Sequence, residues 1–423
     1  MNEDTKEPVT KQGCKTIILN ICEADHPRFL ADISYAKQII DSAIAEDIHQ
    51  KIFPQGTTEV GYCFKGFERE SKKQKLKIRR IEIGGTVYRV RPAFVLSYMR
   101  GKVSDRKWGI FIMRFGVPFW AIALVFGKYP MYWYRLWLDF GKNSIIGTTI
   151  FSSSDLPEHI LGDEEHTKVK GEKAYIATTV DKGCLLGASV VSEASVDCLG
   201  KGYQTARDEM LNINKKHTVI TVNKDGWSAT QTAFIFLYKG ITIIQCFLHG
   251  FIKVRHRKTK KQSADFNTAS DKIWNAYEAE SAVSFAQRIR RVKEWALTKL
   301  QNTPMKDNIL DLCKKVTKWK VFYQYPESYR TSNMLDRIMK LMKRCIKNAQ
   351  YFHSTTEQAT LYMRAFALVH NFSPSSPWTI KKHNGLVSPA DRINQFTYSD
   401  DWCINLMVAT SLGGYRTEVR NPL

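Results

Sequence analysis

Paired cysteines are missing from this chain. It has nine cysteines, an odd number, and none of them belongs to a Cys-x-x-Cys pair. Zinc ribbons and dithiol redox sites depend on such pairs, so neither class of site is indicated. Scattered single cysteines are typical of proteins that stay in a reducing cytoplasm.

Long apolar runs are also missing. Residues 1–15 have no apolar stretch after a basic one, so they do not form a secretory signal. The most apolar segment, Phe115–Gly127, has thirteen residues and lies between Arg114 and Lys128. A helix that spans a bilayer needs about 20 apolar residues. We therefore expect a cytoplasmic protein with no membrane partner.

Acidic residues are scarce relative to basic ones. The chain has 41 Asp and Glu against 63 Lys and Arg, which gives a formal net charge of +22. Such an excess attracts polyanions, and nucleic acid is the first candidate. Phosphate contacts carry no sequence information, so the charge alone predicts no sequence preference. The alternative is a chain that is basic only for solubility.

The first part of the chain is expected to bind DNA. Residues 1–70 are weakly patterned, and the basic run Lys72–Arg80 follows them. Two alternating runs around Gly84-Gly85 then predict a hairpin, because paired glycines supply the positive φ of a tight turn. Arg79, Arg80 and Arg114 are the arginines that we expect to contact DNA here.

Residues 104–138 have the outline of a helix-turn-helix. The second helix is expected over Met131–Leu138, with Pro130 at or just before its start. We expect Tyr132 and Arg135 to face DNA, and Trp133 and Trp137 to form the buried face. The alternative interpretation is a pair of helices packed into the core or into a dimer interface.

From about residue 158 the pattern changes to alternating strands and helices. Two β-rich runs flank Asp181-Lys182-Gly183 and predict a hairpin, and the next elements are a helix, a strand, a helix and a strand. The order β-β-α-β-α-β predicts an α/β layer architecture. In order, these segments are residues 174–180, 184–191, 198–211, 217–226, 231–237 and 241–247.

The rest of the chain is mostly helical in pattern. A basic run opens it, and we expect that run to hold DNA phosphates. The stretch Arg330–Tyr351 predicts a strong amphipathic helix. The basic residues of the run are Lys253, Arg255, Arg257, Lys258, Lys260 and Lys261.

Two aspartates are candidates for metal binding. Asp163 stands at the entry to the first predicted hairpin, and Asp225 closes the strand Val219–Asn223. Carboxylates from neighbouring strands suit hard cations such as Mg²⁺, which serve phosphoryl transfer. The alternative for Asp225 is a plain Asp-Gly turn, and for Asp163 a solvated loop acid.

Cys246 and His249 form a Cys-x-x-His motif after the last predicted strand. The pair supplies only half of a zinc site, and no second pair of suitable spacing occurs. Taken alone, the motif is explained equally well by a buried thiol and a hydrogen-bonded histidine.

These residues together resemble a known family. The segments LGDEEHTKVKGEKAYIATTVDKGCLLGASV, VNKDGWSATQTAFIFLYKGITIIQCFLHGFIKVRHR and RTSNMLDRIMKLMKR resemble bacterial insertion-sequence transposases of the DDE type. The Asp-Gly-x-x-Ala-Thr and Cys-x-x-His series is similar to the Mutator-like branch. The similarity covers roughly residues 78–375.

The resemblance implies an RNase H-like core, a mixed sheet flanked by helices, interrupted by a helical insertion and preceded by an α-rich DNA-binding module. Asp163 and Asp225 match the first two metal ligands, and Cys246 and His249 match the pair that supports the core. The third ligand is normally Glu, and here Asp336 occupies its position. Glu327, in a predicted loop, is the alternative. The implied segments are residues 1–70 (weakly patterned), 71–150 (DNA-binding module), 158–252 (core, first part), 253–325 (insertion), 326–372 (core, second part) and 373–423 (C-terminal tail).

The expected function is DNA transposition in a bacterium or archaeon. Two Mg²⁺ ions, with Mn²⁺ as a substitute, would serve cleavage at the terminal inverted repeats of an element and joining to target double-stranded DNA. We expect a homodimer or a larger assembly on DNA. Two alternatives remain open: a catalytically inactive, transposase-derived DNA-binding protein, and an RNase H-like nuclease such as a junction resolvase, which cuts without joining.

Overall fold

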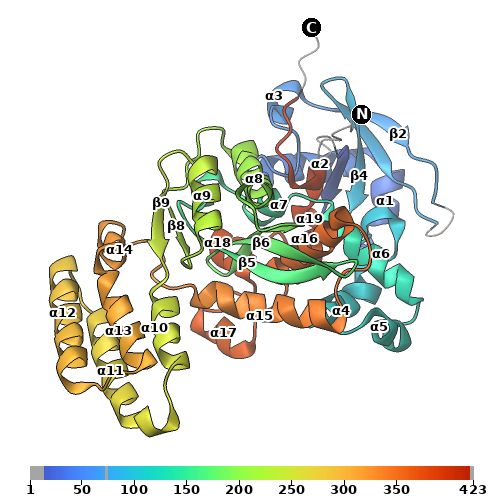
Figure 1. Cartoon of the computed structure of the whole chain (residues 1–423). Helices are drawn as coiled ribbons and strands as arrows, with labels where there is room; N and C mark the ends of the chain where they lie inside the picture. Colours follow the sequence, from blue (N-terminus) through green and yellow to red (C-terminus); the bar gives the residue numbers. More distant parts are fainter. Residues whose placement is uncertain (1–13, 72–74, 420–423) are drawn as a thin grey trace, which may run out of the picture. The chain divides into compact units, whose positions relative to one another are not determined.

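The computed structural model describes residues 14–71 and 75–419 (Figure 1). In these residues the protein is mixed α/β with two sheets and about 54% helix, which confirms the α/β part of the predicted fold class. Its residues fall into two compact units. Unit 1 comprises the described residues up to Leu156, Glu164–His217 and the described residues from Met339 onward, and unit 2 comprises Pro157–Asp163 and Thr218–Ile338. Both units combine separated stretches, so the chain does not divide into the consecutive segments suggested by the sequence.

The N-terminal part of unit 1 is built on a four-stranded sheet with the order β1-β4-β3-β2. β1 and β4 are parallel, and the other neighbours are antiparallel. The predicted hairpin between β3 and β4 is confirmed, and Gly84 and Gly85 have positive φ values of 52° and 73°. The strands are β1 (Thr16–Leu19), β2 (Cys63–Phe67), β3 (Arg79–Ile83) and β4 (Thr86–Pro92).

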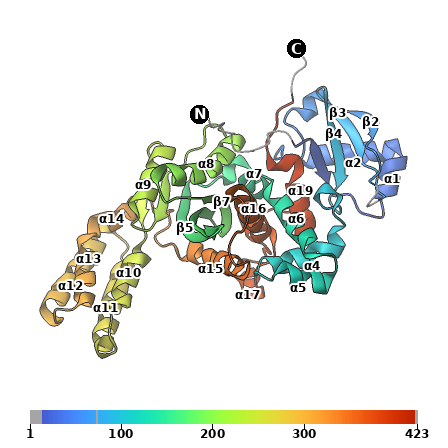
Figure 2. The ribbon, with the colours of Figure 1, turned by 45° about the vertical axis from the view of Figure 1, so that its right-hand side comes forward.

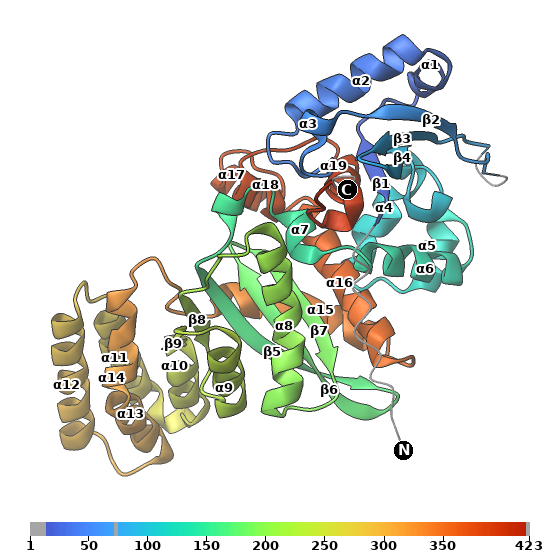
Figure 3. The same cartoon turned by 90° about the horizontal axis from the view of Figure 1, so that it is seen from above.

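Residues 14–70 hold more regular structure than their weak patterning predicted. β1 is only four residues long, too short to show alternation, and it still supplies three fully buried side chains. Figures 2 and 3 show α2 beside this sheet. The helices of this stretch are α1 (His26–Ala31), α2 (Ile33–Glu46) and α3 (Thr57–Val60).

The helices predicted within residues 104–138 are present as α4 (Val103–Met113), α5 (Phe119–Phe126) and α6 (Pro130–Gly141). Trp133 and Trp137 are 0% and 1% exposed, as predicted. The indole of Trp137 donates a hydrogen bond of 3.1 Å to the carbonyl of Tyr362. α6 is therefore packed on the helix that contains Tyr362, which favours the core-helix alternative over a freely projecting recognition helix.

A second part of unit 1 contains the predicted hairpin of β6 (Glu172–Asp181) and β7 (Cys184–Val191). α8 (Val196–Ile213) covers this hairpin, and its Gly202 approaches Ala177 and Val191. α16 (Thr356–Phe372) lies along β7. Its Asn371 bonds both backbone groups of Leu185, so side chains from a helix satisfy the backbone of a strand at the edge of the sheet.

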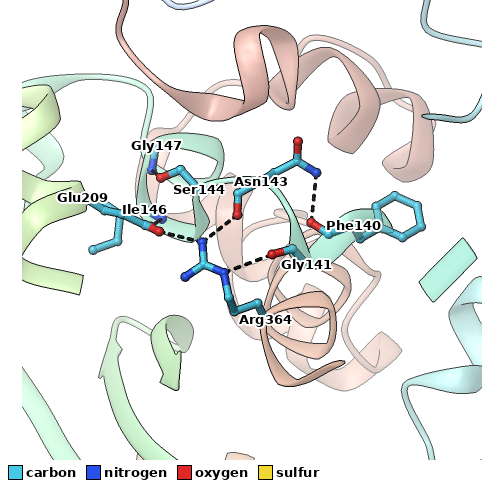
Figure 4. Close-up of polar contacts among 8 residues, drawn as sticks. All are labelled: Phe140, Gly141, Asn143, Ser144, Ile146, Gly147, Glu209 and Arg364. Carbon is cyan, nitrogen blue, oxygen red and sulfur yellow. Dashed lines mark hydrogen bonds and ion pairs between the residues drawn. The ribbon is translucent and has the colours of Figure 1, made fainter. Parts of the chain in front are cut away.

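A buried ion pair ties three distant stretches of unit 1 together (Figure 4). Arg364 of α16 and Glu209 of α8 are joined at 2.6 Å and are 7% and 3% exposed. Arg364 also donates to the carbonyls of Gly141 and Asn143, at 3.0 and 2.7 Å. Glu209 accepts from the backbone N–H of Ile146, at the start of α7 (Ile145–Thr149). The charges are thus fully hydrogen-bonded, as burial requires.

The segment after α16 is not the tail that the sequence suggested. α17 (Pro377–Lys382), α18 (Pro389–Asn394) and α19 (Trp402–Ala409) follow it. Seven of the eight residues of α19 are buried, and α19 packs against β1 and α4. Pro and Gly breaks between short helices made this region look irregular in sequence.

Unit 2 contains a parallel set of strands and a group of helices. The strands are the first part of β5 (His159–Val169), β8 (Thr221–Lys224) and β9 (Thr242–Gln245), and the whole second sheet has the order β7-β6-β5-β8-β9. α9 (Ser228–Leu237) connects β8 to β9. β5 was missed from the sequence because its GDEEHTK stretch is charged, so the true order is β-β-β-α-β-α-β.

The predicted helical insertion is confirmed as helical. Its helices share one apolar core that includes Phe247, Phe285 and Trp319. Short 3-10 helices elsewhere are η1 (Ser97–Met99), η2 (Ser153–Asp155) and η5 (Ser411–Gly414). The elements of this region are α10 (Phe247–His256), η3 (Lys260–Gln262), α11 (Ser263–Tyr277), α12 (Ala282–Lys299), α13 (Pro304–Lys314), α14 (Val316–Lys320) and η4 (Val321–Gln324).

Candidate active site

Asp163 lies in β5, and Asp225 directly follows the neighbouring parallel strand β8. Leu161 and Asn223 are the last residues paired between β5 and β8, and each aspartate is two residues further along the chain. Side chains on a strand alternate between faces, so Asp163 belongs to the same face of β5 as Leu161. Neighbouring strands are about 4.8 Å apart. The two aspartates therefore follow the same pair of residues on neighbouring strands, and a site that they share stays a prediction.

The position of Asp163 within its strand differs from the expected one. It was expected at the opening of a strand, and it stands inside β5, which begins at His159. Asp225 follows β8 directly, as expected, and its carboxylate is 33% exposed. Its Oδ1 accepts a hydrogen bond of 2.9 Å from the N–H of Trp227 and lies 3.4 Å from the buried amine of Lys224. Asp225 thus also closes the turn that leads into α9.

Cys246 directly follows β9, the strand next to β8. Lys224 is opposite Gln245 in the β8–β9 pair, so Asp225 and Cys246, the next residues, stand at matching positions. The Cys246 N–H donates to the carbonyl of Lys224 at 2.8 Å. Cys246 also directly precedes α10, so the Cys-x-x-His motif spans a strand end and the first turn of a helix.

His249 forms a hydrogen bond with Cys246 and interacts electrostatically with Asp336. Its hydrogen bond with Cys246 raises the pKa of the imidazole to about 9, against the opposing effect of burial, and the nearby Asp336 and Asp163 raise it further. Burial raises the pKa of the Cys246 thiol, but hydrogen bonds from His249 and Ser332 outweigh burial and lower it. At neutral pH His249 is therefore a cation beside acidic candidate residues.

Asp336 is in the first turn of α15 (Asn333–Asn348), a helix that the sequence predicted. Ser332, which precedes the helix, donates from Oγ to Asp336 Oδ2 at 3.1 Å. The Ser332 N–H donates to Cys246 Sγ at 3.2 Å, and the two side chains are 3.3 Å apart. Among the described ion pairs there is none between Asp336 and Lys340, the alternative role that the sequence offered for Asp336.

Glu327 is not part of this network. It follows Pro326 in an exposed turn after η4, which agrees with the predicted loop. The hydrogen bonds that converge on Cys246 instead come from Ser332, one turn before Asp336. Of the two alternatives for a third acid, the structure thus connects Asp336 to the other candidates. We call Asp163, Asp225, Cys246, His249 and Asp336 the strand-end cluster.

Sequence reasoning missed the residues that hold α15 in place. Asn223 donates from its side chain to the carbonyl of Tyr329 at 2.8 Å, and the N–H of Phe247 donates to the carbonyl of Arg330 at 3.3 Å. The Arg330 guanidinium donates to the carbonyl of Tyr277 and lies 4.2 Å from that ring. The only available signal was that Arg330 and Ser332 belong to the RTSNMLD segment.

Three of the predicted DNA-contacting residues are buried. Arg79 is 3% exposed and donates to the carbonyls of Phe29 and Leu30. Arg114 is 7% exposed and donates to the carbonyls of Ser373 and Pro374. Tyr132 is 9% exposed and donates to the carbonyl of Arg100. Their assignment to DNA was wrong, because each polar group is used inside unit 1.

Other predicted DNA-contacting residues are accessible. Arg135 is exposed on α6, and Arg80 is half-buried and donates to the carbonyl of Lys65. The basic run extends through the last turn of α10 and past its end, and all its predicted cations are exposed. These residues are Lys253, Arg255, Arg257, Lys258, Lys260 and Lys261.

The strand-end cluster fits a divalent cation by its chemistry. Asp163, Asp225 and Asp336 offer carboxylate oxygens, the ligands that Mg²⁺ prefers. Both Asp163 and Asp336 act electrostatically on His249 and raise the pKa of its imidazole. Within the described residues, however, no group of three or more His, Cys, Asp or Glu side chains is already arranged as a metal site.

Comparisons with known proteins do not identify a family for this chain. A scan against protein-family models and a search of curated proteins found no match to this chain. No helix in the described ranges is both long and apolar enough to cross a membrane. The function is therefore argued from the strand-end cluster and the distribution of charge.

Proposed function

We propose that the protein is a DDE-type transposase that cleaves DNA at element ends and joins it to target DNA, with an RNase H-like core. One observation carries the proposal. Asp163 and Asp225 are each two residues past the paired Leu161 and Asn223, and the Cys246–Ser332 contact brings the helix of Asp336 to the end of β9. Converging carboxylates on rigid elements are what metal-dependent phosphoryl transfer requires.

Asp163, Asp225 and Asp336 would hold two Mg²⁺ ions, for which Mn²⁺ would substitute. When bound, these ions supply Lewis-acid stabilisation of the attacking and leaving oxygens. The His249 cation offsets the repulsion between Asp163 and Asp336 in the metal-free protein. Ser332 holds the Asp336 carboxylate through its hydroxyl, so the carboxylate is oriented before it binds a ligand.

The charge of the chain supports DNA as the substrate. The net charge is +22, and the basic run after α10 is fully exposed. These cations belong to the same unit as the strand-end cluster. They would contact phosphates of double-stranded DNA, which positions the duplex without reading its sequence.

One observation favours a second candidate function, DNA binding without catalysis. Asp225 Oδ1 already accepts from the Trp227 N–H and lies 3.4 Å from the amine of Lys224. If Asp225 serves only to stabilise this turn, the proposed metal site lacks one of its three carboxylate ligands. The protein would then be a transposase-derived DNA-binding protein.

A plasmid assay separates these possibilities. Supercoiled plasmid with the terminal repeats of the element is incubated with the protein and Mg²⁺, and the products are resolved on gels. Cleavage at the repeats followed by joined products supports the transposase. Cleavage without joining indicates an RNase H-like nuclease, and binding with no cleavage indicates the second candidate.

A further inference from the structure

The exposed face of α15 carries cations and no acid. The helix buries an apolar face that includes Leu335 and Met342, both 0% exposed. Its exposed positions are two asparagines and five basic residues, and its one acid, Asp336, is only partly exposed. The five cations are Arg337, Lys340, Lys343, Arg344 and Lys347.

These cations repel one another along the helix. Residues three or four apart are neighbours on a helix surface, and like charges at these spacings destabilise it. Lys340 has such neighbours at Lys343 and Arg344, and Lys347 has them at the same two residues. Of these five cations, only Lys343 has an acidic partner among the ion pairs of the described residues. That partner is Glu165, at 3.2 Å. The arrangement costs stability in the isolated protein and suits a surface that binds a polyanion.

We infer that this face of α15 binds the phosphate backbone of DNA and leads a strand toward Asp336. The inference rests on the proposed function for its choice of DNA. Arg337 and Lys347 are ten residues apart, which is about 15 Å along a helix. One strand of a duplex presents a charge about every 3.4 Å along its axis, so the face matches about four phosphates.

Nucleic acid fits this surface better than an anionic membrane does. Helices that bind at a membrane surface insert an apolar face between lipids. The apolar face of α15 is already buried in the protein, with Leu335 and Cys345 at 0% and 2% exposure. Only its charged face is exposed to solvent. A row of exposed cations without inserted apolar side chains is typical of binding to a phosphate backbone.

The test removes charge at Lys340 and Arg344, which are exposed and have no ion pair among the described residues. The variant is Lys340→Gln with Arg344→Gln. The matched control is Lys37→Gln with Lys201→Gln, which removes two exposed charges from α2 and α8, helices of mixed charge. Dissociation constants for a 30-base-pair duplex are measured by fluorescence anisotropy in EDTA, from 50 to 200 mM NaCl.

The double variant should bind all duplexes more weakly. The plot of the logarithm of the association constant against the logarithm of the salt concentration should become less steep by about 1.8, or about 0.9 per lost phosphate contact. The control should keep the wild-type slope, and the melting temperature of the double variant should stay equal or rise, because repulsion is relieved. An unchanged slope overturns the inference, as does a loss of binding to phosphatidylserine vesicles with DNA binding intact. Because EDTA prevents cleavage, this outcome is independent of whether the proposed metal chemistry is correct.

Discussion

The thiol of Cys246 lies 3.3 Å from the hydroxyl of Ser332, and this contact joins the last parallel strand to the helix that carries Asp336. The same hydroxyl donates to Asp336 Oδ2 at 3.1 Å. The Cys-x-x-His motif is therefore in direct contact with the residue that holds the third acid. This relationship gives the motif a role in which no zinc is needed.

Ser332→Ala should impair metal use more than DNA binding. Loss of an outer hydrogen bond to a metal ligand typically costs 10–100-fold in metal affinity or activity. We expect the Mg²⁺ concentration for half-maximal cleavage to rise about tenfold, with the DNA dissociation constant unchanged. Cys246→Ser, which keeps a polar partner for Ser332, should have the smaller effect. Equal Mg²⁺ requirements for wild type and Ser332→Ala would mean that Ser332 only caps the helix.

Asp336 and Glu327 should respond differently to substitution. Asp336 contacts the Ser332–Cys246 network, whereas Glu327 lies in an exposed turn. We expect Asp336→Ala to abolish Mg²⁺-dependent cleavage and Glu327→Gln to keep wild-type rates, both measured on the same plasmid substrate. Full strand transfer by Asp336→Ala would remove it from the site and make Glu327 the third acid.

Neutralising the lysines that follow α10 should weaken DNA binding without changing the preference for one DNA sequence over another. Lys258, Lys260 and Lys261 are exposed, and Lys258 lies 4.6 Å from the ring of Phe266. Substituting all three by Gln should flatten the salt dependence by roughly one slope unit per lost phosphate contact. A loss confined to the element ends would show that these residues recognise bases.

The buried Arg364–Glu209 pair should dominate the stability of unit 1. Glu209→Ala leaves the Arg364 charge buried without its partner, which typically costs about 3–5 kcal/mol. The exposed Arg290–Glu294 pair of α12 is the matched control, and Glu294→Ala should cost less than about 1 kcal/mol. Urea unfolding measures both free energies. A similar small loss in the two variants would mean that unit 1 relaxes around Arg364.

Local sequence patterns predicted local structure well. Gly84-Gly85 predicted a hairpin and Pro130 predicted a helix start, because both depend on the φ angles that these residues favour. Asp225 was also correctly placed directly after a strand. The order of the predicted elements also led to the prediction that Asp163 and Asp225 share a site, which the metal titration below tests.

Long-range burial was not visible in the sequence. Arg79, Arg114 and Tyr132 look like surface groups, and only the packed structure supplies the carbonyls that receive their hydrogen bonds. β5 was hidden because its Glu164 is buried and bonded to Tyr203, a partner 39 residues away. Tertiary partners of this kind override both hydropathy and charge.

The central claim is that Asp163 and Asp225 share one divalent-metal site, and Mn²⁺ binding tests it most directly. Titration calorimetry would compare the wild type with Asp163→Asn and Asp225→Asn, and with Asp271→Asn on the exposed surface of α11 as control. We predict that each of the first two variants loses more than about tenfold in Mn²⁺ affinity, while the control binds like the wild type. Wild-type Mn²⁺ affinity in Asp163→Asn or Asp225→Asn would contradict the shared site.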